Sequence, residues 1–204
     1  MNPLNSIKGV WIAGIVLAVV LAVIVNLAAG VGWFDFNHPE FWRWVHVIAG
    51  IIWIGLLYYF NFVQMPAVAA AGPDAAAINK HVAPRALLWF RWAAVVTWIS
   101  GAMYLMGTLQ FANVFSLGFA GGFDPHYGLP MGIGVWLGTI MLFNVWVLIW
   151  PNQKKVLGLV EAGDEEKARA KKIATMASRT NVVLSIPMLM FMVAARGGVS
   201  IIAL

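Results

Sequence analysis

The chain has 204 residues, of which 62% are hydrophobic and 10% are charged. Its mean hydropathy of +0.83 is far above that of a soluble domain and predicts an integral membrane protein. The sequence contains no cysteine, which excludes disulfides, thiolate metal ligands, iron–sulfur clusters and covalently attached c-type haem. The net charge of +5 does not indicate a nucleic-acid partner, because most basic residues fall in one loop between apolar runs.

Five apolar runs are long enough to cross a bilayer as helices. They cover residues 10–29, 41–63, 85–108, 130–150 and 181–203. The sequence therefore predicts an all-α integral membrane bundle of five transmembrane helices, forming one domain over residues 1–204. The first run lacks a cleavage motif and is interpreted as a retained helix. The segment 152–180 is rich in charged residues and predicts a helical loop in the cytoplasm. No internal repeat is expected.

Proline residues stand close to the predicted helix boundaries. Pro84 and Pro130 are placed to open the third and fourth spans, because a proline in the first turn leaves no hydrogen bond unmade. Pro66 and Pro151 are expected to close the second and fourth spans.

The distribution of basic residues predicts the orientation of the bundle. Lys8, Lys80 and Arg85 fall on the same side as the seven lysines and arginines of residues 154–179. The opposite loops carry only Arg43, with Arg196 near the C-terminus. The positive-inside rule then predicts an N-terminus in the cytoplasm and a C-terminus outside.

A histidine lies within the second apolar run. His46 is followed at helical spacing by Ala49 and Gly50, with Trp53 one turn further, so the helix surface beside the imidazole carries little bulk. One interpretation is a b-type haem, with His46 as the iron ligand and this smooth surface as the wall for the macrocycle. The other is that the small residues let a neighbouring helix approach, with His46 donating a hydrogen bond across the interface.

The second axial ligand of such a haem is left open. His126, in an outer loop, is a candidate metal ligand together with His46, although most loop histidines of this kind are simply exposed. Met103, Met106, Met131 and Met192 are further candidates, although methionines in membrane helices mostly serve packing.

Polar side chains from four spans are expected at the inner end of the bundle. They are Asn61, Gln64, Arg91, Asn144 and Asn181. Amides and a guanidinium could bind a small planar anion, such as a purine like urate, or a quinone-like molecule, with Arg91 as the charged anchor. The alternative is that the amides bridge helices and Arg91 extends to the membrane surface.

Four blocks of sequence resemble the urate oxidase N-terminal membrane domain of bacterial membrane-bound urate-oxidising proteins. They are WVHVIAGIIWIGLLYYFNFVQ, PRALLWFRWAAVVTWISG, WLGTIMLFNVWVLIWPNQKK and SRTNVVLSIPMLMFMVAA. The histidine and WIG of the first block are also distantly similar to HemJ-type and copper-resistance D-type membrane proteins, and the HemJ similarity implies the haem-ligand role for His46. Longer family members continue into a CxxCH cytochrome domain, which this cysteine-free sequence lacks.

The resemblance implies a multi-pass protein of the bacterial inner membrane. The leading interpretation is a redox protein that uses haem b to pass electrons from a small reductant, such as urate, to a separate periplasmic cytochrome c. The alternative is a cofactor-free accessory subunit of a larger respiratory or photosynthetic complex, with Gly134 and Gly138, a GxxxG pair, among its contacts. Whether the chain is itself an enzyme is left open.

Overall fold

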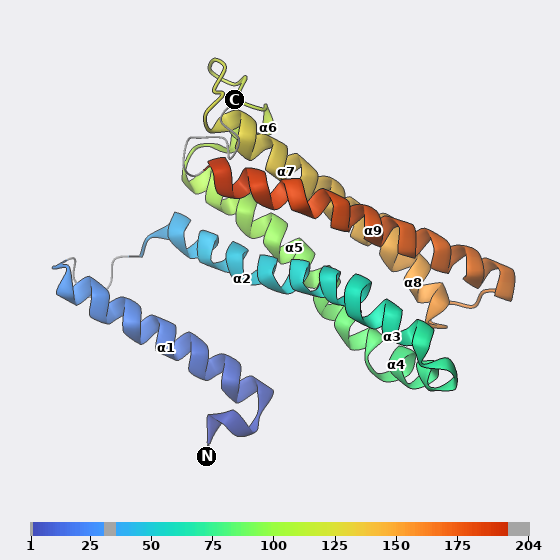
Figure 1. Ribbon diagram of the computed structural model, residues 1–204. Helices are drawn as coiled ribbons and strands as arrows, with labels where there is room; N and C mark the ends of the chain where they lie inside the picture. Colours follow the sequence, from blue (N-terminus) through green and yellow to red (C-terminus); the bar gives the residue numbers. More distant parts are fainter. Residues whose placement is uncertain (1, 31–35, 196–204) are drawn as a thin grey trace. The chain divides into compact units, whose positions relative to one another are not determined.

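The computed structural model describes residues 2–30 and 36–195, and every regular element in these ranges is a helix (Figure 1). Five of the described helices are long and apolar enough to cross a membrane. These observations confirm the all-α prediction, while the direction of insertion stays a prediction. The chain divides into two compact units, residues 1–37 and 38–204. The assignment of residues 1–204 to one transmembrane domain also stays a prediction.

The first unit contains one long helix. A short 3₁₀ turn, η1 (Pro3–Asn5), precedes α1 (Ile7–Ala28). Ser6 caps α1, since its side chain accepts a 3.0 Å hydrogen bond from the backbone N–H of Gly9. Beyond Lys8 the helix has no ionisable residue, as the prediction of a membrane span requires.

The second unit begins with a helical hairpin. Its first arm consists of α2 (His38–Tyr58), the π-helical segment η2 (Tyr59–Gln64) and α3 (Met65–Ala70). The 3₁₀ turn η3 (Gly72–Asp74) and the short helix α4 (Ala75–His81) form the connection. The second arm is α5 (Ala83–Gly107), which packs along α2 (Figure 1).

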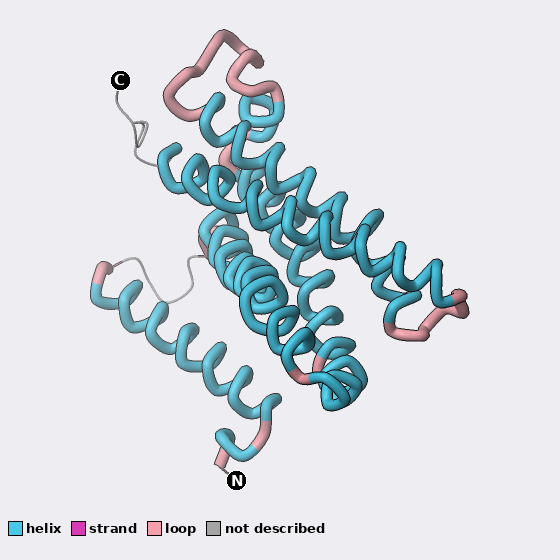
Figure 2. Tube along the Cα trace, turned by 45° about the vertical axis from the view of Figure 1, so that its right-hand side comes forward, coloured by secondary structure: helices cyan, strands magenta, loops and turns pink. Residues whose placement is uncertain are grey.

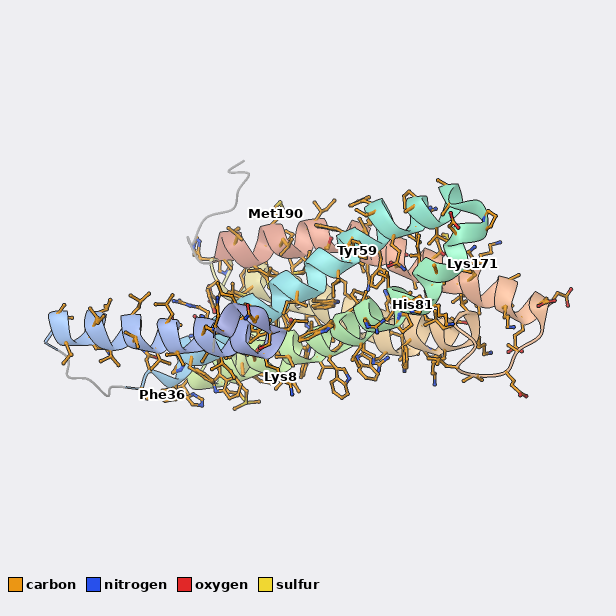
Figure 3. The ribbon with its side chains drawn as sticks, turned by 90° about the horizontal axis from the view of Figure 1, so that it is seen from below. Lys8, Phe36, Tyr59, His81, Lys171 and Met190 are labelled. Carbon is orange, nitrogen blue, oxygen red and sulfur yellow. The ribbon has the colours of Figure 1, made fainter. Side chains whose placement is uncertain are left out.

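A second hairpin completes the unit. The short helix α6 (Phe111–Phe115) leads into α7 (Gly128–Phe143), the π-helical segment η4 (Asn144–Ile149) and α8 (Trp150–Val156). The returning arm is α9 (Asp164–Ala194), which packs against α7, η4 and α8. The ribbon in Figure 1 shows α9 beside α7 and α8, and Figure 2 shows the same helices as a tube turned by 45°. Figure 3 shows that Met190 and Lys171, both on α9, lie toward opposite ends of this unit.

The core of the second unit forms where the two hairpins meet. Leu57 of α2, Phe90 of α5, and Met141 and Val145 of the fourth span are almost fully buried. These side chains join all four long arms into one apolar cluster with Met188 of α9. Many large apolar side chains of this unit also face outward, as expected of helices surrounded by lipid.

Two predicted helix ends are not ends in the structure. The second span continues through Pro66 to Ala70, and the fourth continues through Pro151 to Val156. In both cases a π-helical segment stands just before the proline. A proline has no N–H and clashes with the carbonyl four residues earlier, and the wider π turn accommodates both effects.

The fifth span also differs from its predicted bounds. The charged segment from Asp164 and the apolar segment from Asn181 form one continuous helix of 31 residues, with Pro187 inside it. The acidic residues Asp164, Glu165 and Glu166 occupy its first turn, where the helix dipole favours negative charge. The predicted end at residue 203 lies outside the described residues.

Candidate functional site

His46 lies in the interface between α2 and α5. Its ring rests against Gly101 of α5, where an added Cβ would stand 2.8 Å from Nδ1 and 2.9 Å from Cε1. Only glycine leaves space for the imidazole at this position. Nδ1 is 2.7 Å from the backbone carbonyl oxygen of Thr97. Because a carbonyl can only accept, Nδ1–H donates this bond, and in the neutral imidazole Nε2 then carries the lone pair.

This arrangement suits a metal ligand in one respect. Histidines that bind metals through one ring nitrogen usually donate the other ring N–H to a carbonyl or a carboxylate, which fixes the ring orientation. The bond from His46 to Thr97 is of that kind. No hydrogen bond to Nε2 is made within residues 2–30 and 36–195, so this atom remains available to a ligand.

Helix α5 lies against the small-residue surface beside His46. Ala49 is buried, and a Cβ on Gly50 would stand 3.7 Å from Cγ2 of Thr97. Trp53 is only 2% exposed and belongs to the core cluster. The surface predicted as a haem wall therefore packs on a protein helix, as the second interpretation of His46 expects. The binding of haem by these residues stays a prediction.

His126 lies in the loop before α7, which Asp124 organises. The Asp124 carboxylate accepts hydrogen bonds from the backbone N–H groups of His126, Tyr127 and Gly128 and from the side chain of Asn113, at 3.0–3.1 Å. These donors, led by Tyr127 N–H and Asn113, lower the Asp124 pKa to about 2. Burial raises the Tyr127 pKa.

The described residues contain no group of three or more His, Asp or Glu side chains that could hold a metal ion. The ligand role of His126 stays a prediction. Of the four methionines considered as axial ligands, Met192 packs against the glycines of α7, where a Cβ on Gly134 would lie 2.8 Å from its Cγ.

The five predicted inner polar residues divide into separate contacts. Asn144 donates a 2.8 Å hydrogen bond to Asn181, which in turn donates to the carbonyl of Met141 at 3.0 Å. Asn61 donates to Ser178 of α9 at 2.8 Å. The guanidinium of Arg91 stacks over the ring of Trp150, 3.7 Å from its centroid. The structure thus joins Asn144 to Asn181 and pairs Asn61 and Arg91 with other residues.

Two of these residues retain unused polar atoms. Oδ1 of Asn61 and Oε1 of Gln64 are buried, and neither accepts a hydrogen bond within the described part of the chain. Gln64 is 8% exposed and lies one turn after Asn61 on η2. Buried acceptors are normally satisfied, so these two oxygens are the inner atoms best suited to a water or a polar ligand.

The sequence prediction missed the serine partners of this region. Ser178, Asn181 and Ser185 follow one another at helical spacing on one face of α9. Each makes a hydrogen bond to another span: Ser178 with Asn61, Asn181 with Asn144, and Ser185 with the hydroxyl of Tyr58 at 3.0 Å. The spacing of these three residues was the available signal. Thr97 and Gly101, which position His46, carried no comparable pattern.

A short internal repeat accompanies the two π-helical segments, contrary to the prediction that the chain has none. The pattern W-x-G-x4-F-N occurs from Trp53 to Asn61 and again from Trp136 to Asn144. In each copy the asparagine lies in a π-helical segment and hydrogen bonds to α9. π-Helical turns inside α-helices are frequent at functional sites.

The second hairpin also carries the signature of a known family. Residues 126–201 match the Urate oxidase N-terminal family. This match confirms the family resemblance predicted from the sequence, while the distant similarity to HemJ-type and copper-resistance D-type proteins stays a prediction. The matched Urate oxidase N-terminal region contains Asn144 and Asn181, whereas His46, Asn61 and Arg91 precede it. No curated protein and no solved structure matched the sequence.

Proposed function

We propose that this chain is a redox protein of the bacterial inner membrane, in which Nε2 of His46 ligates a b-type haem. The proposal includes electron transfer from a small reductant such as urate to a separate periplasmic cytochrome c. The observation that carries it is the bond from Nδ1–H of His46 to the Thr97 carbonyl, which leaves Nε2 as an electron-pair donor. A bound haem would supply one-electron transfer.

The residues around His46 would hold the ring in place. The Thr97 carbonyl sets its tautomer, and Gly101 provides the space that it occupies. Ala49, Gly50 and Trp53 support the ligand by keeping α2 packed on α5. Because α5 covers that surface, a macrocycle would approach from the side of Nε2.

We place the reductant at the inner end of the bundle. The unused oxygens of Asn61 and Gln64 could accept hydrogen bonds from the N–H groups of a purine such as urate. Arg91 supplies positive charge on the neighbouring helix α5. Asn144 and Asn181 already bond to each other, so they would shape this end of the bundle rather than bind the reductant directly.

The test is a reduced-minus-oxidised absorption spectrum of protein purified in detergent from cells supplied with haem. Wild type is compared with His46→Ala and with the control His81→Ala, which removes an exposed histidine of α4. We expect a b-type haem signal in wild type and in His81→Ala, and its loss in His46→Ala with the fold retained by circular dichroism. A folded but colourless wild type would refute the haem proposal.

The second candidate is a cofactor-free accessory subunit of a larger membrane complex. The observation favouring it is that α5 fills the small-residue surface beside His46, so the imidazole already has a structural role between two helices. Gly134 and Gly138 are not free contacts in this case, because both face Met192 of α9. A colourless protein that purifies with other membrane subunits in mild detergent would support this function.

A further inference from the structure

We propose that a groove between the fourth and fifth spans binds a phospholipid with an anionic headgroup. The groove has a volume of about 560 Å³ and lies where η4 faces the first half of α9. Its apolar lining comes from Leu148, Ile173, Met176 and Ala177. Two cationic side chains, Arg169 and Lys172, line it on the side toward the N-terminus of α9, and the polar residues Asn144 and Thr180 line it as well.

The two cations of this groove form no ion pair within the part of the chain that the structure describes. Among the residues that the structure describes, ion pairs join Arg43 to Glu40 and Lys155 to Glu166. Arg169 and Lys172 take part in neither, and both are exposed. Two cations beside an apolar surface are complementary to a ligand that has a negative head and an apolar tail.

The order of the lining residues along α9 matches the shape of a lipid. Arg169 and Lys172 come first, followed by Ile173, Met176 and Ala177, and the helix then continues into its apolar membrane segment. From Arg169 to Thr180 the helix rises roughly 16 Å, enough for a headgroup and the upper part of an acyl chain. A headgroup at Arg169 would therefore place its chains along the helix that enters the bilayer.

The location of the groove also favours a lipid over a soluble anion. Lys171, the neighbour of Lys172, lies at the end of the unit opposite Met190 (Figure 3), where the chain changes from charged to apolar sequence. Met176 is 56% exposed although it lines the groove, so the apolar part opens outward. A phosphate ion would use the two cations and leave this apolar lining without a partner.

The proposal can be tested by native mass spectrometry of the full chain in detergent. The protein is titrated with phosphatidylglycerol, with zwitterionic phosphatidylcholine of the same acyl chains, and with the soluble headgroup glycerol phosphate. The groove variant is Arg169→Ala/Lys172→Ala. The matched control is Lys171→Ala/Arg179→Ala, which removes one lysine and one arginine from exposed positions of α9 outside the groove. Circular dichroism verifies that both variants are folded.

We expect wild type to bind phosphatidylglycerol in preference to phosphatidylcholine. The groove variant should bind it about 25-fold more weakly, equivalent to about 2 kcal/mol, whereas the control variant should bind like wild type. Equal losses in the two variants would show a general charge effect and overturn the proposal. Glycerol phosphate binding as tightly as the intact lipid would overturn it as well, because the groove would then be an anion site.

Discussion

In each of the two hairpins of the 38–204 unit, two helices pack closely at a glycine and are joined by a polar contact, but the polar groups differ. In both, a glycine lets a side chain of the opposite helix approach closely: Gly101 accepts the ring of His46, and Gly134 accepts Met192. In the first hairpin the polar contact runs from the imidazole to the Thr97 carbonyl. In the second it is an amide pair, Asn144 with Asn181.

The two hairpins differ in whether the polar side chains at these contacts keep an atom that makes no hydrogen bond. Asn181 uses both its oxygen and its nitrogen on protein partners and is 0% exposed, so its amide is fully satisfied. His46 uses only one of its two ring nitrogens. A side chain with an unused lone pair can bind a further group, whereas a satisfied amide mainly holds helices together. The proposed haem ligand therefore lies in the first hairpin, although the family match covers residues 126–201 of the second.

The largest effect is expected from filling the glycine beside His46. In Gly101→Ala the new Cβ would lie 2.8 Å from Nδ1, which displaces the rigid ring and breaks its bond to Thr97. We expect a loss of about 1–3 kcal/mol in stability, measured by thermal unfolding in detergent. Gly55→Ala is the control, because its Cβ would meet nothing within 4 Å.

The equivalent change in the second hairpin sharpens the comparison. Gly134→Ala also meets a side-chain atom at 2.8 Å, but this atom is Cγ of Met192, which can move by a change of rotamer; the backbone N of Met192 and the carbonyl oxygen of Met188 would lie at 3.3 and 3.4 Å. We therefore expect a smaller loss of stability than for Gly101→Ala in the same unfolding experiment. An equal or larger loss of stability in Gly134→Ala would contradict the expectation that Met192 yields more easily than the ring of His46.

Removing the amide pair should have the next largest effect. Asn181→Ala deletes two hydrogen bonds and leaves the side-chain NH2 of Asn144 without its acceptor, whereas the carbonyl of Met141 keeps the backbone N–H of Asn144. We expect a loss of about 1–2 kcal/mol in thermal or denaturant unfolding. Thr180→Ala, at the neighbouring exposed position, should change stability little.

Acid should weaken the second hairpin at its entry loop. The folded Asp124 pKa of about 2 lies below its ordinary value of 3.8, so the charged carboxylate stabilises the folded loop. This stabilisation is fully present above about pH 4 and is lost as the pH falls toward 2. Melting temperatures measured between pH 6 and pH 2 should therefore fall less for Asp124→Asn than for wild type. Parallel curves would show that Asp124 does not contribute.

The smallest expected effect concerns the contact between the hairpins. Tyr58→Phe removes one hydrogen bond to Ser185, and a single interhelical bond in a membrane protein contributes about 0.6 kcal/mol. Tyr59→Phe is the control, because the Tyr59 hydroxyl makes no hydrogen bond within the described residues. Thermal unfolding should show that Tyr58→Phe is less stable than Tyr59→Phe by about that free energy. Identical melting temperatures of the two variants would contradict the role of Tyr58.

Much of the helical layout could be predicted because the apolar runs are long and nearly free of charge. The incorrect predictions concern helix ends, where a local sequence rule was overridden by tertiary packing. Pro66 and Pro151 read as helix ends, but the π-helical segments before them let both helices continue. The charged residues from Asp164 were predicted to belong to a loop that ends at residue 180, yet they continue into the fifth span as one helix, with the small side chains of Ala170, Ala174 and Ala177 buried against the preceding span.

The sequence by itself determined the all-α class, the five long apolar helices and the resemblance to a family, because these depend on composition, run length and short motifs. It left two interpretations of His46 open and grouped five polar residues by depth alone. Only the tertiary structure decided that α5 covers Gly50, that Asn144 meets Asn181, and that Arg91 stacks on Trp150. Partner choice depends on how each helix is rotated about its axis, and that rotation follows from the packing of all four arms together.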